Sequence, residues 1–191
     1  MPFQYKLAIF ASGAGTNAEA IMAHFAAHPT IGVALLLSNN TNAGALQRAK
    51  KFGIPSKTFA RFQFRESGEV LSWLKDAGVT HIVLAGFLWL VPQNLLKAFP
   101  QRIINIHPAL LPKFGGKGMY GSKVHESVIA SGDVETGITI HEVNEHFDEG
   151  KILFQATCPV HPGDNPDAVA QKVHALEHAH FPKVIEKWIL G

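Results

Sequence analysis

The stretch that decides the fold reads Lys6-Leu-Ala-Ile-Phe-Ala11 followed by Ser12-Gly13-Ala14-Gly15-Thr16-Asn17-Ala18. The first six residues form an apolar run that is typical of a buried strand, and the glycines that follow predict a tight turn. From Ala18 the apolar residues recur at helical spacing, through Ile21 and Phe25. We therefore expect a strand, a glycine turn and a helix, which together form the opening unit of an α/β sheet.

Strand-like and helix-like segments continue to alternate after this unit. Short apolar runs indicate strands at residues 31–38, 56–59, 79–85 and 102–107, and amphipathic runs indicate helices at residues 43–51, 66–76 and 92–99. A glycine-rich loop at residues 108–121 precedes an expected helix at 123–130, two strands at 136–143 and 151–159 that can pair as a hairpin, and a last helix at 167–190 with a kink at Pro182. The expected fold class is α/β: a Rossmann-like, doubly wound, mostly parallel sheet with an antiparallel edge contributed by the C-terminal part.

The length, composition and net charge of the chain exclude several classes of protein. The chain has 191 residues, enough for one domain and short for two, and its 47% hydrophobic and 17% charged residues exclude native disorder. The 17 lysines and arginines exceed the 15 acidic residues by only two, without a basic run, so we expect no nucleic-acid partner.

The apolar stretches, the N-terminus and the single cysteine indicate the compartment in which the chain works. The longest apolar stretch, at residues 82–91, is about half of what a membrane-spanning helix needs, so no membrane partner is expected. The N-terminus enters a strand-like run without a secretory signal, so we expect a cytoplasmic protein. The single cysteine, Cys158, excludes an internal disulfide and is interpreted as a small core residue.

The glycine turn lies where backbone N–H groups at a helix N-terminus can hold an anion. It also fits the G-x-G-x-x-[GA] dinucleotide pattern, but the second strand ends Leu37-Ser38-Asn39-Asn40, without the acidic residue that would bind ribose hydroxyls. We therefore favour a terminal phosphate held by the turn together with Thr16 and Asn17. A tight structural turn that binds no ligand is the alternative.

The stretch Ile104-Asn105-Ile106-His107-Pro108 carries the strongest chemical signal. Residues two apart share one face of a strand, so an amide donor and an imidazole converge at the carboxyl end of a parallel strand, where open α/β sheets place their ligands. Asn105 and a protonated His107 can stabilise the oxyanion of a tetrahedral intermediate, and His107 can relay a proton. This pattern favours acyl transfer without a nucleophilic side chain. A buried structural histidine is the alternative.

A carboxylate near His107 would favour the imidazolium and fix its orientation. Asp148, in the polar loop at residues 144–150, is the best placed by topology. Glu145 and Glu149 compete with it, and spacing alone leaves the choice open.

The last helix contains a pattern that suggests zinc. His174-Ala-Leu-Glu177-His178 matches H-x-x-E-H, but no downstream glutamate stands in a suitable place as a third ligand, and the chain has 11 histidines. We expect no metal.

The order of these motifs resembles a known family. The glycine turn, Asn105-Ile-His107-Pro108 with Leu110-Leu111-Pro112, the Asp148-Glu-Gly150 loop and Glu177-His178 together resemble the phosphoribosylglycinamide formyltransferases, the folate-dependent enzymes of purine synthesis, from about residue 7 to 188. The resemblance implies direct transfer of a formyl group from 10-formyltetrahydrofolate to the amine of glycinamide ribonucleotide, through a tetrahedral intermediate. The N-I-H-P…L-L-P core is shared with other 10-formyltetrahydrofolate enzymes, so it specifies the co-substrate more than the acceptor.

The resemblance also implies roles for individual residues and a single domain, with a phosphate-binding half at 1–95 and a catalytic and folate-binding half at 96–191. The catalytic residues would be Asn105, His107 and Asp148, with Asp148 raising the pKa of His107. The ribonucleotide would be bound by Gly15, Thr16, Asn17, His174, Ala175, Leu176 and Glu177. The folate would be bound by Arg65, Leu88, Trp89, Leu90, Val91, Asn105, Asn144, Glu145, His146, Phe147 and Asp148.

Two residues and one loop depart from the family pattern. Trp89 stands where an arginine that contacts the glutamate tail of the folate is expected, although an indole can stack on the aminobenzoyl ring. Ala14 replaces an asparagine in the glycine turn, and the loop at residues 115–121 is longer and richer in glycine. These departures concern binding and leave the chemistry untouched.

Rival interpretations differ in the acceptor. A deformylase would pass the formyl group to water but resembles this domain with an added N-terminal module, and a methionyl-tRNA formyltransferase carries an extra C-terminal domain and a basic surface. A phosphosugar-binding module without catalysis is the rival from another class. The sequence leaves a monomer and a homodimer equally open.

Overall fold

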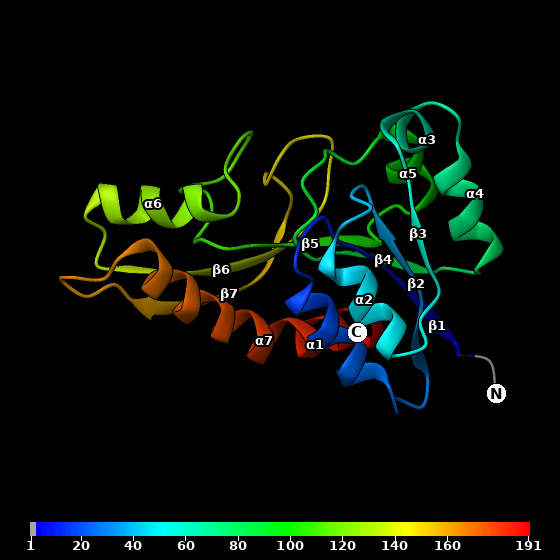
Figure 1. Cartoon of the computed structure of the whole chain (residues 1–191), viewed down its shortest axis with the longest axis horizontal. Coiled ribbons are helices and arrows are strands. Elements are labelled where there is room, and N and C mark those ends of the chain that lie inside the picture. The colour runs from blue at the N-terminus through cyan, green and yellow to red at the C-terminus, as the bar shows by residue number, and fades with distance from the viewer. Residues whose placement is uncertain (1–2) are drawn as a thin grey trace.

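The computed structural model describes residues 3–191, which form one mixed sheet with helices on both faces (Figure 1). The strands are β1 (Tyr5–Phe10), β2 (Ile31–Ser38), β3 (Ser56–Thr58), β4 (His81–Leu84), β5 (Ile103–His107), β6 (Glu135–Glu142) and β7 (Ile152–Pro159). The helices are α1 (Thr16–Phe25), α2 (Gly44–Lys51), α3 (Arg61–Arg65), α4 (Glu69–Asp76), α5 (Gln93–Ala98), α6 (Ser122–Ser131) and α7 (Pro166–Leu190).

The order of the strands confirms the expected fold class. Within the described residues the sheet has seven strands in the order β3-β2-β1-β4-β5-β6-β7. Strands β1 to β5 pair in parallel, whereas β6 pairs antiparallel with β5 and β7 antiparallel with β6. The chain winds outward from β1 to β3 and then returns beside β1 at β4. The carboxyl ends of β1 and β4 therefore form the switch point, where sheets of this kind bind ligands.

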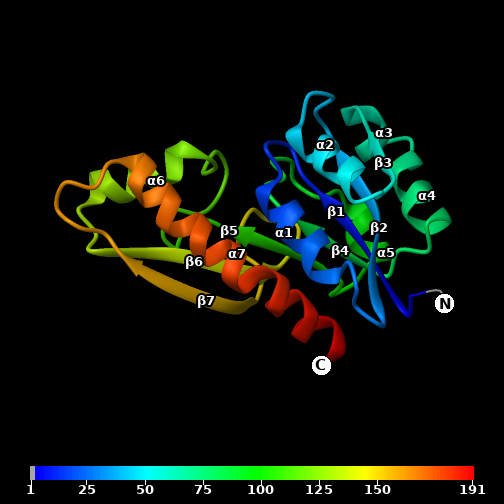
Figure 2. The same cartoon turned by 60° about the horizontal axis from the view of Figure 1, so that its bottom comes forward.

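Alternating side chains of the central strands supply two cores. In β1, Leu7 and Ile9 pack with α1, α2 and α7 on one face of the sheet, and Ala8 and Phe10 pack with α3, α4 and α5 on the other. Figure 2 shows α7 crossing the sheet beside α1, where their apolar faces meet. Burial of both sheet faces explains why the parallel strands read as continuous apolar runs.

The structure adds detail to three local expectations. The helix expected at residues 66–76 begins only at Glu69, because Gly68 before it adopts a left-handed conformation (φ 72°), and the short helix α3 at Arg61–Arg65 was not expected. The last helix continues through Pro182, which is buried within α7. Cys158 is only half-buried on the edge strand β7, although it packs against the core as expected.

Candidate active site

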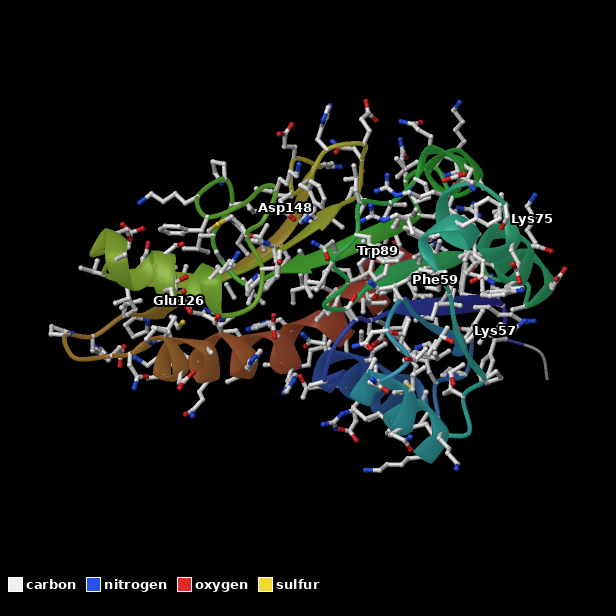
Figure 3. The ribbon with its side chains drawn as sticks, turned by 45° about the horizontal axis from the view of Figure 1, so that its top comes forward. Lys57, Phe59, Lys75, Trp89, Glu126 and Asp148 are labelled. Carbon is white, nitrogen blue, oxygen red and sulfur yellow. The ribbon has the colours of Figure 1, made fainter. Side chains whose placement is uncertain are left out.

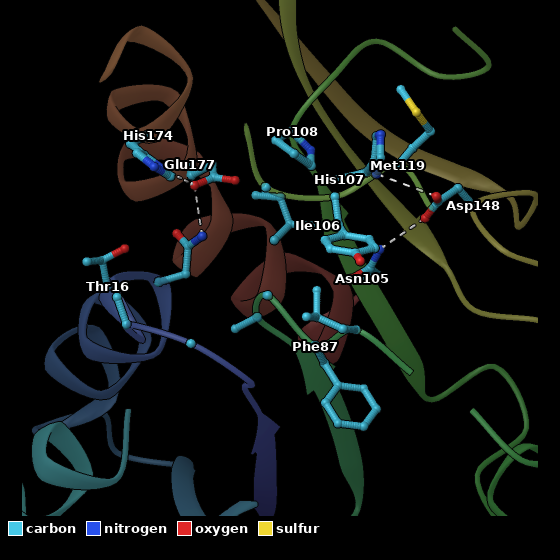
Figure 4. Close-up of a pocket in the computed structure, with 18 of the residues that line it drawn as sticks. Thr16, Phe87, Asn105, Ile106, His107, Pro108, Met119, Asp148, His174 and Glu177 are labelled. Carbon is cyan, nitrogen blue, oxygen red and sulfur yellow. Dashed lines mark hydrogen bonds and ion pairs between the residues drawn. The ribbon is translucent and has the colours of Figure 1, made fainter. Parts of the chain in front are cut away.

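A cavity of about 620 Å³ opens at the switch point, above the carboxyl ends of β1, β4 and β5. Figure 4 shows its walls, with Thr16, His174 and Glu177 on one side and His107 and Asp148 on the other. The lining consists of residues 13–17, 85–88, 105–108 and 116–121, with His125, Phe147, Asp148, His174, Glu177 and His178.

Asn105 and His107 reach the cavity from the end of β5, and both contact the same carboxylate. Asn105 Nδ2 lies 3.4 Å from Asp148 Oδ1, and His107 Nδ1 lies 3.5 Å from Asp148 Oδ2. His107 is 3% exposed, and its Nε2 donates to the Phe114 carbonyl at 2.7 Å. The period-2 spacing on the strand therefore brings the amide and the imidazole together with one acidic side chain.

The structure distinguishes between the three candidate carboxylates. Glu145 and Glu149 are exposed and lie outside the cavity, whereas Asp148 lines it (Figure 4). The loop turns inward at this point because Asp148 itself has a left-handed backbone (φ 59°), which aspartate tolerates better than most residues. Gly150 then packs so closely that a Cβ atom there would lie 1.6 Å from the Glu142 carbonyl oxygen. The loop is thus fixed against β6.

Asp148 is held as a carboxylate. Burial alone raises its pKa, but the neighbouring His141 and the charge of His107 act in the opposite direction. The Gly116 N–H, which donates to Asp148 Oδ2 at 3.0 Å, adds to them, so the pKa falls below its ordinary value. The Asp148 side chain beside His107 is therefore ionised at neutral pH.

The pKa of His107 differs from the expectation. Burial lowers it most strongly, and the Asp148 carboxylate and the hydrogen bond to the Phe114 carbonyl raise it only in part, so the net pKa lies below its ordinary value. Asp148 acts in the expected direction, but it does not overcome the loss of water around the ring. Without substrate, the imidazole is neutral at pH 7.

His141 belongs to the same cluster and was missed by the sequence analysis. Its Nδ1 lies 2.8 Å from the Glu142 carbonyl, an arrangement that assigns the proton to Nδ1. In that tautomer Nε2 accepts from Asn105 Nδ2 at 3.1 Å. The register of β5 and β6 pairs Asn105 with His141. The pairing of the two strands is the only signal that would have found it.

The opposite end of the cavity is built on the N-terminus of α1. Gly15 has a left-handed backbone (φ 77°), and a Cβ atom there would lie 2.5 Å from Ala45. Asn17 is buried and donates through Nδ2 to Glu177 Oε2 at 2.9 Å. The α1 N-terminus, with Thr16 beside it, therefore faces the cavity with free N–H groups of the kind that hold an anion.

Glu177 is the carboxylate at this end of the cavity. It is buried, and besides the bond from Asn17 its Oε2 lies 2.8 Å from His174 Nδ1, an interaction that raises the pKa of His174. Ala175 and Leu176, which were also expected to bind the ribonucleotide, line no part of the cavity, and Leu176 packs against the core. The helical spacing instead places His178 in the cavity wall.

The residues expected to bind the folate divide into two groups. A smaller cavity adjoins the first and shares Phe87, Asn105, Phe147 and Asp148 with it; it is also lined by Trp89, Leu90, Val91 and His146. Leu88 lines the larger cavity. Asn144 and Glu145 line neither, and Asn144 instead accepts a hydrogen bond from the backbone of His146. Arg65 is exposed on α3 and also lies outside both cavities.

Trp89 is part of an aromatic group at the smaller cavity. Its ring lies 6.0 Å from that of Phe59 and 5.9 Å from that of Phe64, and Figure 3 shows Trp89 and Phe59 on the same side of the sheet. The Arg61 guanidinium stands 5.4 Å from the centre of the Trp89 ring. A positive charge therefore remains beside the position where an arginine was expected.

Residues 3–191 contain neither a metal-binding cluster nor a helix suited to span a membrane. No group of three or more histidine, cysteine or acidic side chains in this part of the chain could hold a metal ion, and Glu177 of the zinc-like pattern is instead bonded to Asn17 and His174. In the same range, no helix combines the length and apolar character that crossing a bilayer requires.

Comparison with known proteins points to one family. The family model described as formyl transferase matches residues 5–185. The chain is 42% identical over 190 residues to the chloroplastic phosphoribosylglycinamide formyltransferase of Arabidopsis thaliana, covering 96% of this chain and 65% of that protein. It is 36% identical over 189 residues to the phosphoribosylglycinamide formyltransferase of Haemophilus influenzae, covering 96% and 86%.

Solved structures agree with this. Glycinamide ribonucleotide transformylase 1 from Geobacillus kaustophilus superposes with a TM-score of 0.87 at 34% identity, covering 98% of this chain and 100% of that one. The phosphoribosylglycinamide formyltransferase of Bacillus halodurans gives 0.85 at 36% identity, covering 95% and 94%. The chain spans 65% and 60% of the length of its relatives from Arabidopsis thaliana and Vigna unguiculata.

Proposed function

This chain belongs to the formyl transferase family, and from that premise we propose that it transfers a formyl group from 10-formyltetrahydrofolate to the amine of glycinamide ribonucleotide. One observation carries the proposal: Asn105, His107 and Asp148 converge at one end of a cavity whose other end is an anion-binding helix N-terminus beside Glu177. A phosphorylated acceptor that spans the cavity would present its far end to the cluster.

The chemical groups at the two ends of the larger cavity suggest how the acceptor would bind. The phosphate would bind at the N-terminus of α1, where Gly15 allows close approach and Thr16 adds a hydroxyl. The Glu177 carboxylate accepts hydrogen bonds only, which suits ribose hydroxyls. The amine would then lie near His107. Since this cavity takes residues from both parts of the chain, we propose that residues 1–95 supply the phosphate end and residues 96–191 the catalytic cluster.

The folate would enter from the smaller cavity. The side chains of Trp89, Leu90 and Val91 give it an apolar wall that suits a flat ring system, and this wall continues into the larger cavity through Phe87. Asn105 and Asp148 line both cavities, so a formyl group bound between them would meet the amine at this point. Of the residues implied by the resemblance, Arg65, Asn144 and Glu145 lie further out.

The chemical step needs no covalent bond to the protein. The amine nitrogen forms a bond to the formyl carbon, giving a tetrahedral intermediate whose oxygen is negative, and the bond from that carbon to N10 of the folate then breaks. The amine loses a proton and N10 gains one. Asn105 and His107 would donate to the oxyanion, His107 would relay the proton, and Asp148 would stabilise the imidazolium as it forms.

The test is an absorbance assay of formyl-folate consumption by the purified protein, with and without glycinamide ribonucleotide, and with His107→Ala as the control. We expect turnover that requires the ribonucleotide and is lost in the variant. Turnover without the ribonucleotide would show a deformylase. No turnover in either case would contradict formyl transfer to this acceptor.

A further inference from the structure

One imidazole in the cavity wall has no assigned role. His125 lies on α6, four residues after the glycine-rich loop, and is 4% exposed. It lines the larger cavity together with His107 and Glu177. Its exposed neighbour on the helix, Glu126, does not line that cavity.

The hydrogen bonding of His125 is incomplete. Its Nδ1 is enclosed by protein and finds no hydrogen-bond partner anywhere in residues 3–191. Native proteins satisfy nearly all buried polar atoms, and exceptions gather where a ligand or water completes the set. The Oδ1 atom of Asn17, in the wall of the same cavity, is unpartnered in the same way when only described residues are considered. Two residues of one cavity wall thus carry unpartnered buried atoms, a combination that favours a ligand over a packing fault.

The position of His125 along the cavity follows from its neighbours. Helix α6 packs against α7, which carries Glu177, and it follows the loop that leaves the strand of His107. Burial lowers the pKa of His125, and the charges of His174, Glu177 and His107 all act on it. His125 therefore lies between the end of the cavity that suits ribose and the end that holds the catalytic cluster.

We propose that His125 binds the amide that joins the amine-bearing carbon of the acceptor to its ribose. This inference rests on the proposed function. An amide offers one N–H donor and one carbonyl acceptor, and a neutral imidazole offers one donor and one acceptor in return. Glu177, as an acceptor, matches hydroxyls but cannot serve a carbonyl. His125 would thus recognise the glycinamide part of the acceptor and position its amine beside His107.

The experiment compares two ligands by titration calorimetry: glycinamide ribonucleotide, and ribose 5-phosphate, which lacks the amide. His125→Phe keeps the ring shape and removes both nitrogens, and Glu126→Gln is the matched control on the same helix. We expect His125→Phe to bind the ribonucleotide about tenfold more weakly, with ribose 5-phosphate unchanged within about twofold. In turnover, KM for the ribonucleotide rises and kcat changes less, because the contact exists before the reaction.

Other outcomes overturn the inference in recognisable ways. Equal loss for both ligands would show a contact with the ribose or a general disturbance of the cavity, and unchanged binding would show no contact. If His125→Phe does not fold, His125→Asn, which retains one donor and one acceptor, must show a smaller loss that is still confined to the ribonucleotide. Wild-type protein that neither binds nor formylates the ribonucleotide would overturn the proposed function itself, and the inference with it.

Discussion

Replacing Asp148 by asparagine removes one charge from the catalytic cluster and leaves its shape. The amide keeps an acceptor for the Gly116 N–H, which lies 3.0 Å from Asp148 Oδ2. The charge itself stands 3.5 Å from His107 Nδ1. A unit charge pair at that distance is worth about 5 kcal/mol at an effective dielectric constant of 20 and about 1 kcal/mol in water. With the Asp148 side chain 11% exposed, we take about 3 kcal/mol, or roughly a hundredfold in rate.

The loss falls on kcat, because the imidazolium that Asp148 stabilises forms during the reaction and not when the substrate binds. Steady-state formyl transfer, measured from pH 5 to pH 9, should show kcat reduced roughly a hundredfold and KM changed little. The apparent pKa of His107 in the kcat/KM profile should fall further, since Asp148 raises that pKa in the wild-type protein. Glu149→Gln, which removes an exposed charge one residue away, is the control. Equal rises in KM for Asp148→Asn and Glu149→Gln, with kcat unchanged, would refute the reasoning.

Three further predictions follow from other parts of the molecule. Burial, with the charge of Arg102, lowers the pKa of His81 to about 4, so the unfolded chain takes up the proton first and stability falls as pH drops from about 6.5 towards 4. Urea unfolding at pH 7 and pH 4.5 measures the free energy of unfolding that is lost at the lower pH. This loss should be smaller by about 2 kcal/mol in His81→Phe than in the wild-type protein, and equal losses in the two proteins would contradict the prediction. Gly150→Ala should lower both Tm and turnover, because its Cβ would meet a backbone oxygen, and wild-type stability would be the contrary result. Arg61→Ala, which removes the cation beside Trp89, should raise KM for formyl-folate about threefold. Lys57→Ala, which removes the cation beside Trp73, is the control and should leave KM unchanged, because Trp73 lies outside both cavities. Equal effects of the two variants on KM would count against a role of Arg61 at the folate site.

Local patterns predicted those parts of the site that depend on one segment. The run from Lys6 to Ala18 contains its own strand, turn and helix start, and the spacing of Asn105 and His107 needs only the period of a strand. Both features depend on neighbours in the chain. Sequence periodicity captures such features directly.

Features that depend on strand pairing could not be found in this way. His141 joins the cluster only because β6 pairs with β5 in a register that sets it against Asn105. The choice of Asp148 over Glu145 depends on how the loop folds back on Gly116 and Gly150. Backbone conformation limited one prediction as well, since Gly68 in a left-handed conformation makes α4 begin three residues later than the helical pattern indicated.

The neutral state of His107 in the free protein is compatible with its role as an acid. An oxyanion forming about 4 Å from the ring contributes about 4 kcal/mol at an effective dielectric constant of 20, which raises the pKa of His107. Burial, which lowers the pKa of His107 at rest, also strengthens this response, because water no longer screens the new charge. The imidazole therefore becomes protonated as negative charge appears on the substrate. Its charge is present when the intermediate forms and absent when the substrate binds, which is the condition for stabilising the transition state more than the bound substrate.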